Sequence, residues 1–502
     1  MYWAPSIPPS PHLTWMMWQP LGVLSSTARF ISTFVLLCPR CPTHPNFPSA
    51  KMSQPFPVDH GMTSFWRSEP HPLDNHRSTD ALPDESDIVI IGAGFAGAAT
   101  AYHCLERSKS SSQSPSVVIL EARQACSGAT GRNGGHLKPD PYYQIGIMAA
   151  EYGVEAAEEV AEFEMKHLLE LQSFIEREKI ECDLDVNRVF DVQFDDEHCA
   201  KTKAAYDLLL SRGATRVKDV EFSPSASAEA VSGVKGARGC FSYRTGRVWP
   251  YKLVMHLLKR AVLGGANLQT YTPVHRVSDS PGVDGKWTVE TSRGSIRAKK
   301  VVFASNAYTA ALAPQYKNHI VPVRGVCSRI VVPNPPENAK NCSYTFRSNA
   351  WDYDYLIHRP DGSIVVGGAK STFYHNATDW YNNTDDSRVI DSAVRYFDNY
   401  MQRRFHGWEN SGAYTDRVWT GIMGDTPDTL PHLGHVPHKP GQLIIAGFNG
   451  HGMPQIFLSA QGIAKMTVDE ASYEETGLPR LFRTSSERLT RTENNILAPA
   501  QG

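Results

Sequence analysis

One segment constrains the fold more than any other: an apolar run of strand length that ends in a glycine-rich turn and continues into an alanine-rich stretch. The run is Asp87–Ile91, and the turn reads Gly92-Ala93-Gly94-Phe95-Ala96-Gly97. Strand, G-x-G-x-x-G turn and helix in this order are typical of a dinucleotide-binding βα unit. Gly92 permits the tight turn, Gly94 lets backbone approach a pyrophosphate, and Gly97 lets helix and strand pack closely. The helix N-terminus then faces the phosphates with its partial positive charge.

The next apolar run supports a nucleotide site over a plain glycine turn between two core elements. It covers residues 117–120 and places Glu121 at its carboxyl end. In dinucleotide-binding folds an acidic residue at about this distance, roughly 20 residues after the glycines, binds the ribose hydroxyls. We therefore expect Glu121 and the adjacent Ala122 to contact the cofactor.

A polar, glycine-rich segment follows, which is too flexible to form core and well suited to lie along phosphates and a ring. The βαβ unit alone does not distinguish NAD from FAD, so this segment matters. Its candidate cofactor contacts are Ser127, Thr130, Arg132, Asn133, Gly134 and Gly135.

Three further blocks have the same character of a strand or helix flanked by small residues. Residues 246–250 read G-R-V-W-P and precede a periodic helix and a strand that reaches Val274. Residues 301–308 form a strand ending in Ala304-Ser305-Asn306, and a buried strand alone leaves Asn306 unexplained. Residues 443–454 repeat the order of strand, glycines and helix, with Pro454 in the expected first helical turn.

From about Ser86 to about Asp469 these blocks resemble the D-amino-acid oxidase-like FAD-dependent oxidoreductases, in the branch that includes gamma-glutamylputrescine oxidase. In that branch a stretch like S-G-x-x-G-R-N-G-G follows the ribose-binding acid. The resemblance implies an α/β fold, α+β overall. The expected fold consists of a Rossmann-like FAD-binding domain of the glutathione-reductase type and a substrate domain built on an antiparallel sheet. The resemblance also implies FAD as the cofactor, with covalent attachment left open.

The resemblance assigns roles to the later blocks. The backbone of Val274 would contact the adenine end of FAD, and Ala304 and Asn306 would lie beside the nucleotide. The last helix would point its N-terminus at the flavin, where a helix start stabilises negative charge. That assigns Gly447, Gly450, Gly452 and Met453 to the cofactor. Because the chain has no second G-x-G-x-x-G for a nicotinamide nucleotide, we expect the flavin to take electrons directly from an organic substrate.

The blocks predict a discontinuous domain organisation. We expect the FAD-binding domain to comprise residues 86–139, 243–310 and 416–470, and the substrate domain residues 140–242 and 311–415. Residues 1–85 are predicted to be a disordered tail and residues 471–502 a C-terminal tail. We hypothesise that translation starts at Met52, which would leave residues 1–51 outside the native protein.

One departure from the family pattern concerns the substrate. Amino-acid oxidases of the family carry an arginine that clamps the substrate carboxylate, and Met423 stands at that position. A buried carboxylate without a partner costs several kcal/mol, so an amine is favoured over an α-amino acid. Arg324 is an alternative clamp or a structural arginine, and Tyr353 and His358 are predicted to line the substrate cavity.

Three residues are predicted to act in catalysis or beside the flavin: His136, His451 and Tyr355. Both histidines lie in glycine-rich loops that the resemblance places near the flavin. His136 is also a candidate for covalent attachment. His432, His435 and His438 do not share one face, so no metal site is expected.

The predicted function is FAD-dependent oxidation of a CH–NH bond in an amine, either a polyamine derivative or a secondary amine. A hydride would pass to flavin N5 and the imine would hydrolyse, with oxygen or another acceptor reoxidising the flavin. The alternatives are an amino-acid oxidase that uses Arg324 as its clamp and a non-catalytic flavin-binding protein.

Charge and hydropathy exclude other classes of protein. The 50 basic and 52 acidic side chains give a net charge of −2, which provides no basic field for nucleic acid. No apolar stretch approaches the roughly 18 residues of a membrane span. We therefore expect a soluble protein of the cytoplasm.

Overall fold

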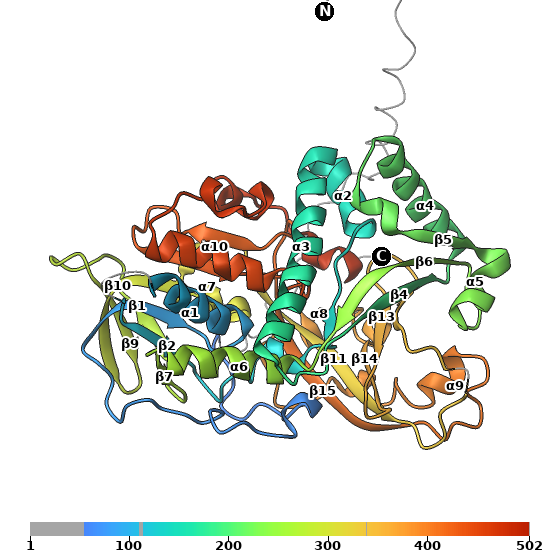
Figure 1. The fold of residues 1–502 in the computed structure, drawn as a ribbon, viewed down its shortest axis with the longest axis horizontal. Coiled ribbons are helices and arrows are strands. Elements are labelled where there is room, and N and C mark those ends of the chain that lie inside the picture. Colours follow the sequence, from blue (N-terminus) through green and yellow to red (C-terminus); the bar gives the residue numbers. More distant parts are fainter. Residues whose placement is uncertain (1–54, 110–113, 338, 501–502) are drawn as a thin grey trace, which may run out of the picture. The chain divides into compact units, whose positions relative to one another are not determined.

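Two β-sheets with helices between and around them form the part of the chain that the structure describes (Figure 1). The structure is a computed structural model, and it describes residues 55–109, 114–337 and 339–500. The predictions for residues 1–51 and for a start at Met52 lie outside these residues.

The first sheet has eight strands and a parallel centre. The order is β16-β17-β10-β1-β2-β7, in which β17, β10, β1, β2 and β7 are parallel neighbours and β16 is antiparallel to β17. Strands β8 and β9 form an antiparallel extension through β10. The strands are β1 (Glu85–Ile91), β2 (Val117–Leu120), β7 (Asn267–Gln269), β8 (Val274–Val277), β9 (Trp287–Thr291), β10 (Gly294–Phe303), β16 (His432–His435) and β17 (Gln442–Ala446).

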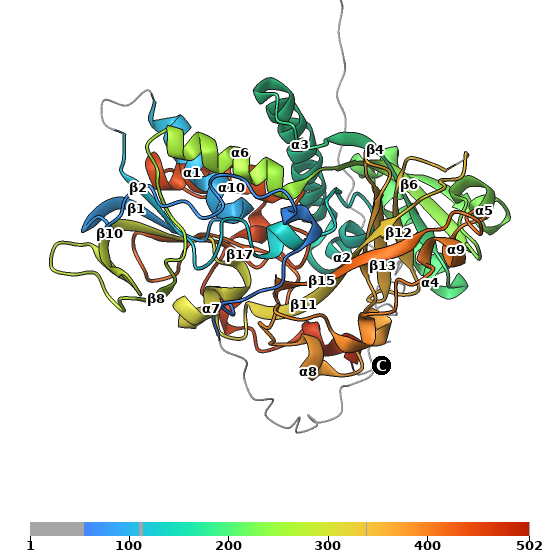
Figure 2. The same cartoon turned by 90° about the horizontal axis from the view of Figure 1, so that it is seen from below.

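The apolar runs of this sheet are buried on both faces, as parallel strands usually are. Ile88 and Ile90 of β1 pack into the core beneath helices α1 (Phe95–Ser108), α6 (Pro250–Leu263) and α10 (Ile456–Val468). Val89 and Ile91 point to the opposite face, where β8 and β9 supply Val274, Trp287 and Val289. Figure 2 shows the three helices on one side of the sheet and β8 on the other.

The second sheet has nine strands in the order β15-β11-β14-β13-β12-β4-β6-β3, with β5 paired to β6. Its pairs are antiparallel except for β12 and β4, which are parallel. The strands are β3 (His136–Leu137), β4 (Asp185–Gln193), β5 (Glu221–Pro224), β6 (Gly239–Arg247), β11 (Val321–Val331), β12 (Ser343–Arg347), β13 (Tyr353–His358), β14 (Ile364–Gly368) and β15 (Tyr414–Asp425). An aromatic-rich core packs against this sheet and includes Trp380, Tyr400 and Trp408.

A long helix stands between the two sheets (Figure 1). It is α3 (Val154–Glu178), and Gly153, with φ +88°, separates it from α2 (Tyr143–Tyr152). The remaining helices are α4 (Asp196–Ser211), α5 (Ser225–Ser232), α7 (Thr309–Leu312), α8 (Ala377–Trp380) and α9 (Tyr400–Arg404).

Strand pairing moves three of the expected domain boundaries. Strand β15 runs to Asp425 within the second sheet, so residues 416–425 belong with the substrate strands. Residues 243–247 end β6, and β3 at residues 136–137 pairs with β6, so these segments belong to the second sheet as well. We keep the two-domain division as a proposal, with boundaries where the pairing changes sheet.

Both expected tails contain ordered, packed residues. Phe65 and Trp66, in the 3-10 turn Phe65–Arg67, are buried in the main core, which corrects the prediction of disorder up to residue 85. At the other end, Tyr473, Leu478 and Phe482 are buried in the same core. The folded part therefore extends beyond the motif-bearing segments at both ends.

Candidate cofactor and active site

One cavity of about 520 Å³ takes in the carboxyl ends of the first sheet's central strands and the strands β11 to β15 of the second sheet. It brings together most of the sequence-predicted site residues. Those that line it are Gly92, Gly94, Glu121, Ala122, Thr130, Arg132, Asn133, Gly134, His136, Val274, Ala304, Asn306, Arg324, Tyr353, Tyr355, Met423, Gly450, His451, Gly452 and Met453. Gly97, Ser127, Gly135, Gly447 and His358 do not line it.

The glycine turn after β1 is as tight as the motif requires. Gly92 has φ +112°, and a Cβ there would lie 2.6 Å from the carbonyl oxygen of Ala304. A Cβ on Gly97 would lie 1.8 Å from the carbonyl oxygen of Gly92. Gly97 therefore acts by letting α1 approach β1, which explains why it packs behind the cavity wall.

Side chains hold the glycine turn and Glu121 together. The Glu121 carboxylate accepts hydrogen bonds from the Ala93 N–H at 2.8 Å and the Arg123 N–H at 3.0 Å. The Thr130 hydroxyl accepts one from the Phe95 N–H, in the first turn of α1, at 3.1 Å. The other amides of that turn have no acceptor within the helix, which is the arrangement that binds phosphate.

The loop from Glu121 to Gly135 is anchored by a buried ion-pair cluster that the sequence motifs did not indicate. Arg123 donates to both carboxylate oxygens of Asp386, at 2.8 and 2.9 Å, and Arg132 lies 3.3 Å from the same carboxylate. Burial opposes the charge on Arg132 and lowers its pKa to about 10. Arg132 also donates to the carbonyl oxygens of Ser127 and Thr420, so most of its guanidinium is committed to the protein. Arg132 therefore orders the loop rather than presenting a free charge.

Residues 56–66 form a strap over this loop. The Val58 carbonyl accepts a hydrogen bond from Arg123 at 3.1 Å, and the Trp66 indole N–H donates to the Asn133 carbonyl at 2.6 Å. The Ser64 hydroxyl donates to the Gly131 carbonyl, and Phe56 and Pro57 line the cavity itself. The strap was predicted to be disordered, and instead it forms part of the cofactor cavity.

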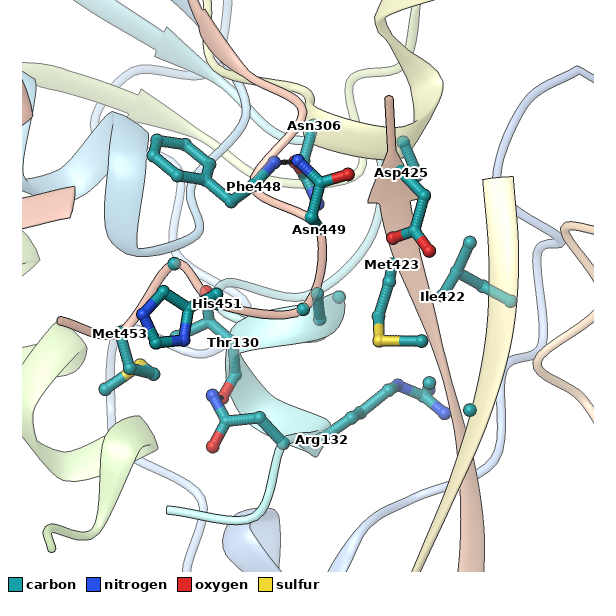
Figure 3. A pocket seen from close by; sticks show the side chains of 18 of the residues that line it. Thr130, Arg132, Asn306, Ile422, Met423, Asp425, Phe448, Asn449, His451 and Met453 are labelled. Atoms are coloured by element: carbon teal, nitrogen blue, oxygen red, sulfur yellow. Dashed lines mark hydrogen bonds between the residues drawn. The ribbon is translucent and has the colours of Figure 1, made fainter. Parts of the chain in front are cut away.

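Two asparagines join the ends of three strands. The side-chain oxygen of Asn306, after β10, accepts from the N–H groups of Gly447 at 2.9 Å and Phe448 at 3.3 Å, after β17. Asn449 accepts from the Thr426 N–H, after β15, at 2.7 Å. Figure 3 shows the two side chains side by side. Asn306 therefore fixes the loop that carries Gly450 and His451, which accounts for an asparagine at the end of a buried strand.

His451 is paired with a buried acid. Its Nε2 lies 3.0 Å from Oε1 of Glu164, which also accepts from the Gln455 amide at 2.7 Å. Burial opposes protonation of His451, but Glu164, with Asp140 further away, outweighs it and raises the pKa of the imidazole above its ordinary value. Glu164 lies three or four residues from the buried Val160, Ala161, His167 and Leu168 of α3, a spacing that could have identified it as an inward-facing acid.

The start of α10 is held by the same helix. His167 of α3 is fully buried, and its Nε2 accepts from the Phe457 N–H, in the first turn of α10, at 2.9 Å. Pro454 was predicted in the first helical turn, but α10 begins at Ile456, so Pro454 lies in the turn before it. Glu164 and His167 thus position the glycine loop and the helix start next to the cavity.

His136 is half-buried and neutral. Burial and the nearby Lys138 lower its pKa to about 3. Its ring meets Tyr355 edge to face at 5.5 Å, and Tyr355 packs so closely on Gly134 that a Cβ there would lie 2.4 Å from the phenol ring. The Tyr355 hydroxyl lies 3.4 Å from the Cys327 sulfur. Tyr355 therefore supports the loop at Gly134 and His136.

The substrate half of the cavity changes the expected roles of two residues. His358 packs against Tyr344 and Trp408 in the aromatic core, away from the cavity, so it is withdrawn as a substrate contact. Arg324 lines the cavity, but its two terminal nitrogens donate to the carbonyls of Asp379 at 3.0 Å and Arg388 at 2.8 Å. These bonds give it a structural role and weaken the alternative of a carboxylate clamp.

Met423 projects from β15 into the cavity (Figure 3). Its side chain lies against Gly325 and Gly450, where added Cβ atoms would be 3.1 and 2.9 Å from it. Met423 therefore places an apolar group between β11 and the glycine loop that carries His451. In an amino-acid oxidase of the family we would expect a charged arginine at this position.

The described residues fit FAD. The hydroxyl of Tyr308, which lines the cavity, is buried and has no hydrogen-bond partner within the described chain. The glycine turn leaves no room for side chains, and Glu121 is fixed beside it. Gly92, Gly94, Glu121 and Thr130 would hold the nucleotide, and the loop Gly450–Met453 would lie by the flavin.

Comparison with known proteins agrees with this geometry. The family described as "FAD dependent oxidoreductase" (DAO) matches residues 87–466. The chain belongs to this family. It is therefore an FAD-dependent oxidoreductase enzyme with a Rossmann-like FAD-binding domain, as the motifs predicted.

Relatives are similar over most of their length. Oxidoreductase OrdL of Rhizobium meliloti is 24% identical, covering 74% of this chain and 80% of the relative. Gamma-glutamylputrescine oxidoreductase of Escherichia coli is 22% identical, covering 77% and 84%. The crystal structure of glycine oxidase from Geobacillus kaustophilus superimposes with a TM-score of 0.61 at 20% identity, covering 78% of this chain and 96% of that one.

A separate, short similarity involves a different protein. A stretch of 60 residues is 55% identical to the mitochondrial amino-acid acetyltransferase of Aspergillus oryzae, and the chain spans only 9% of that protein.

No helix within residues 55–109, 114–337 and 339–500 is long and apolar enough to cross a membrane. No group of three or more His, Cys, Asp or Glu side chains there has the arrangement of a metal site.

Proposed function

We propose that the protein oxidises a CH–NH bond of an amine, a polyamine derivative or a secondary amine, and that the resulting imine is hydrolysed to a carbonyl compound and an amine. When bound, FAD supplies the chemistry by accepting a hydride from the carbon next to nitrogen. The observation that carries the proposal is Met423, an apolar side chain at the place of the family's arginine clamp.

The protein's own residues would orient the substrate and exclude water from the cavity. Apolar and aromatic walls, including Met423 and Tyr355, favour the neutral amine, because burial opposes an ammonium charge. Glu164 raises the pKa of His451, and the protonated imidazole would place positive charge at the loop that precedes α10, where it would stabilise developing negative charge. No general base is assigned, because a neutral amine needs none.

An amino-acid oxidase remains the second candidate function, since glycine oxidase is among the related folds. It would require Arg324 to bind the α-carboxylate with the donors left after its two backbone hydrogen bonds. Sarcosine or proline reducing the flavin faster than putrescine derivatives would favour this candidate.

The test is the visible absorbance of the FAD-loaded protein under anaerobic conditions with a panel of amines headed by gamma-glutamylputrescine. We expect one class of amine to bleach the flavin band. A protein that binds FAD and is bleached by no amine would be a non-catalytic flavin-binding protein. Acid precipitation of the same sample tests covalent attachment, because covalently bound flavin stays in the pellet.

We also propose that the protein works in a reducing compartment, the cytoplasm. The seven described cysteines are all unpaired, which supports this, since disulfides form in oxidising compartments.

A further inference from the structure

A lysine without an ion-pair partner lines the substrate half of the cavity. Lys370 follows β14, in the 3-10 turn Lys370–Thr372, and no described carboxylate lies within ion-pair distance of it. Its ammonium lies over the ring of Tyr353 at 4.2 Å and the ring of Tyr374 at 5.3 Å. The surroundings keep this lysine charged but supply no direct carboxylate partner from the described chain, so a ligand carboxylate can form the ion pair.

The turn that carries Lys370 is rigid. The Ala369 N–H donates to Oδ1 of Asp354 at 2.9 Å, and Gly368 adopts φ +133°, where a Cβ would lie 2.1 Å from the same oxygen. Asp354 is buried and also accepts from the hydroxyls of Tyr396 and Tyr400, at 2.7 and 2.8 Å. The lysine is therefore presented by a fixed backbone, as a binding group should be.

The other charged groups of this region are either paired or differently placed. Arg347 is paired with the buried Asp191 at 3.2 Å, and Lys138 donates to the Thr345 hydroxyl at 3.0 Å. Asp425, near the end of β15 (Figure 3), is the carboxylate that acts on Lys370 from further away, and its Oδ1 is buried without a hydrogen-bond partner among the described residues. Burial raises the pKa of Asp425 to about 6.

The electrostatics around Lys370 favour an anion. The ammonium lowers the pKa of Tyr353, and burial of Lys370 is outweighed by Tyr353, Tyr374 and Asp425, so its own pKa is raised. It therefore stays charged at neutral pH. Beside it, Tyr374 stacks on Trp380 at 4.2 Å and on Trp351 at 5.8 Å, so an apolar aromatic wall adjoins the charge.

We propose that Lys370 binds the carboxylate of the substrate, so that the amine oxidised by this enzyme carries a carboxylate recognised by Lys370 rather than by an arginine at the position of Met423. This inference rests on the proposed function and deepens it by naming the substrate class. The substrate would present its carboxylate to the ammonium and its hydrocarbon part to the wall formed by Trp351, Tyr374 and Trp380.

The test measures binding of phenylacetate and of its neutral counterpart phenylacetamide to the FAD-loaded protein, by calorimetry and by perturbation of the flavin absorbance. Lys370→Met should weaken phenylacetate binding about tenfold or more, as expected for a lost charge-assisted contact. Phenylacetamide binding should be unchanged, and Lys370→Arg should restore most of the affinity for phenylacetate. Equal FAD content and equal circular dichroism show that the variants are folded.

Two matched variants distinguish the effect of Lys370 itself from the effect of the overall charge of the cavity. The double variant Lys370→Met with Asp425→Asn keeps the net charge of the wild type, and it should still bind phenylacetate weakly. Asp425→Asn alone should strengthen binding, because it removes a like charge. Wild-type affinity in the double variant, or a larger loss in Lys138→Met than in Lys370→Met, would overturn the proposal, as would wild-type protein that does not bind phenylacetate.

The same samples separate this inference from the proposed function. If amines bleach the flavin, but those with and without a carboxylate react alike in wild type and Lys370→Met, the role of Lys370 is wrong and the amine oxidase stands. If phenylacetate binding depends on Lys370 but no amine bleaches the flavin, the carboxylate site stands and amine oxidation is wrong.

Discussion

At the scale of single residues, the site depends on polar groups that hold loops rather than on isolated catalytic side chains. His451 was predicted from its glycine-rich loop, but the acid that controls its charge, Glu164, comes from a helix far away in the sequence. Pairing between distant segments leaves no local pattern, so the dyad could not be predicted as a pair. The same reason explains why Asp386, the partner of Arg123 and Arg132, was missed.

The dyad makes a prediction about pH. Glu164→Gln should lower the pKa of His451, because only the more distant Asp140 would then oppose the effect of burial. Histidine NMR titration of the apoprotein measures this, with His451→Gln to assign the signal. An unchanged midpoint in Glu164→Gln would show that Glu164 does not control the imidazole.

The raised pKa of His451 determines how its pairing with Glu164 changes the stability of the fold with pH. A histidine whose folded pKa lies above its ordinary 6.5 stabilises the fold fully below that pH, and the contribution is lost as the pH rises through the folded pKa. The thermal midpoint of the wild type should therefore exceed that of Glu164→Gln most at acid pH, by an amount equivalent to about 1 kcal/mol. The difference should shrink as the pH is raised, and a difference that grows instead would contradict the account.

At the scale of elements, local patterns predicted the regular segments well and the connecting segments poorly. The turn after β1 and the strands β2, β10 and β17 were predicted from apolar runs and the small residues that end them. The strap at residues 56–66 lies within residues 1–85, which were predicted to be a disordered tail. Its order comes from side-chain contacts with the cofactor loop and from Trp66, which is buried against Trp249.

The strap predicts the effect of a small substitution at Gly61. A methyl group there would lie 2.4 Å from Arg123, 2.7 Å from Asp386 and 2.8 Å from Arg132, so the buried ion-pair cluster would have to move. Gly61→Ala should destabilise the protein by about 1–3 kcal/mol, the usual cost of overpacking, and should weaken retention of FAD. Thermal denaturation and FAD dissociation measure the two effects.

The neighbouring Thr63, which is exposed, provides the control. Thr63→Ala should leave both stability and FAD retention unchanged. If Gly61→Ala bound FAD as tightly as Thr63→Ala, the strap would have no part in the cofactor site.

At the scale of the whole molecule, the cavity is assembled from both sheets, and the sequence predicts one half of it better than the other. The nucleotide half could be predicted because its glycines, acid and helix start follow one another in the sequence, and each has a physical reason to be there. In the substrate half Met423 was predicted, but Lys370 and Asp425 were not, since they reach the same cavity only when β14, β11 and β15 pair. The expected domain boundary at residue 416 falls inside β15, which pairs in the second sheet and lines the substrate half of the cavity. We therefore propose a boundary after residue 425.

The central claim is that this cavity oxidises the carbon next to an amine nitrogen. The most direct measurement is the anaerobic rate of flavin bleaching by a carboxylate-bearing secondary amine, compared with the same amine deuterated at the reacting carbon. The account predicts that the amine bleaches the flavin band and that deuteration slows the bleaching, because the C–H bond breaks in that step. An FAD-loaded protein whose absorbance is unchanged by the amine, or is bleached at the same rate by both isotopic forms, would contradict it.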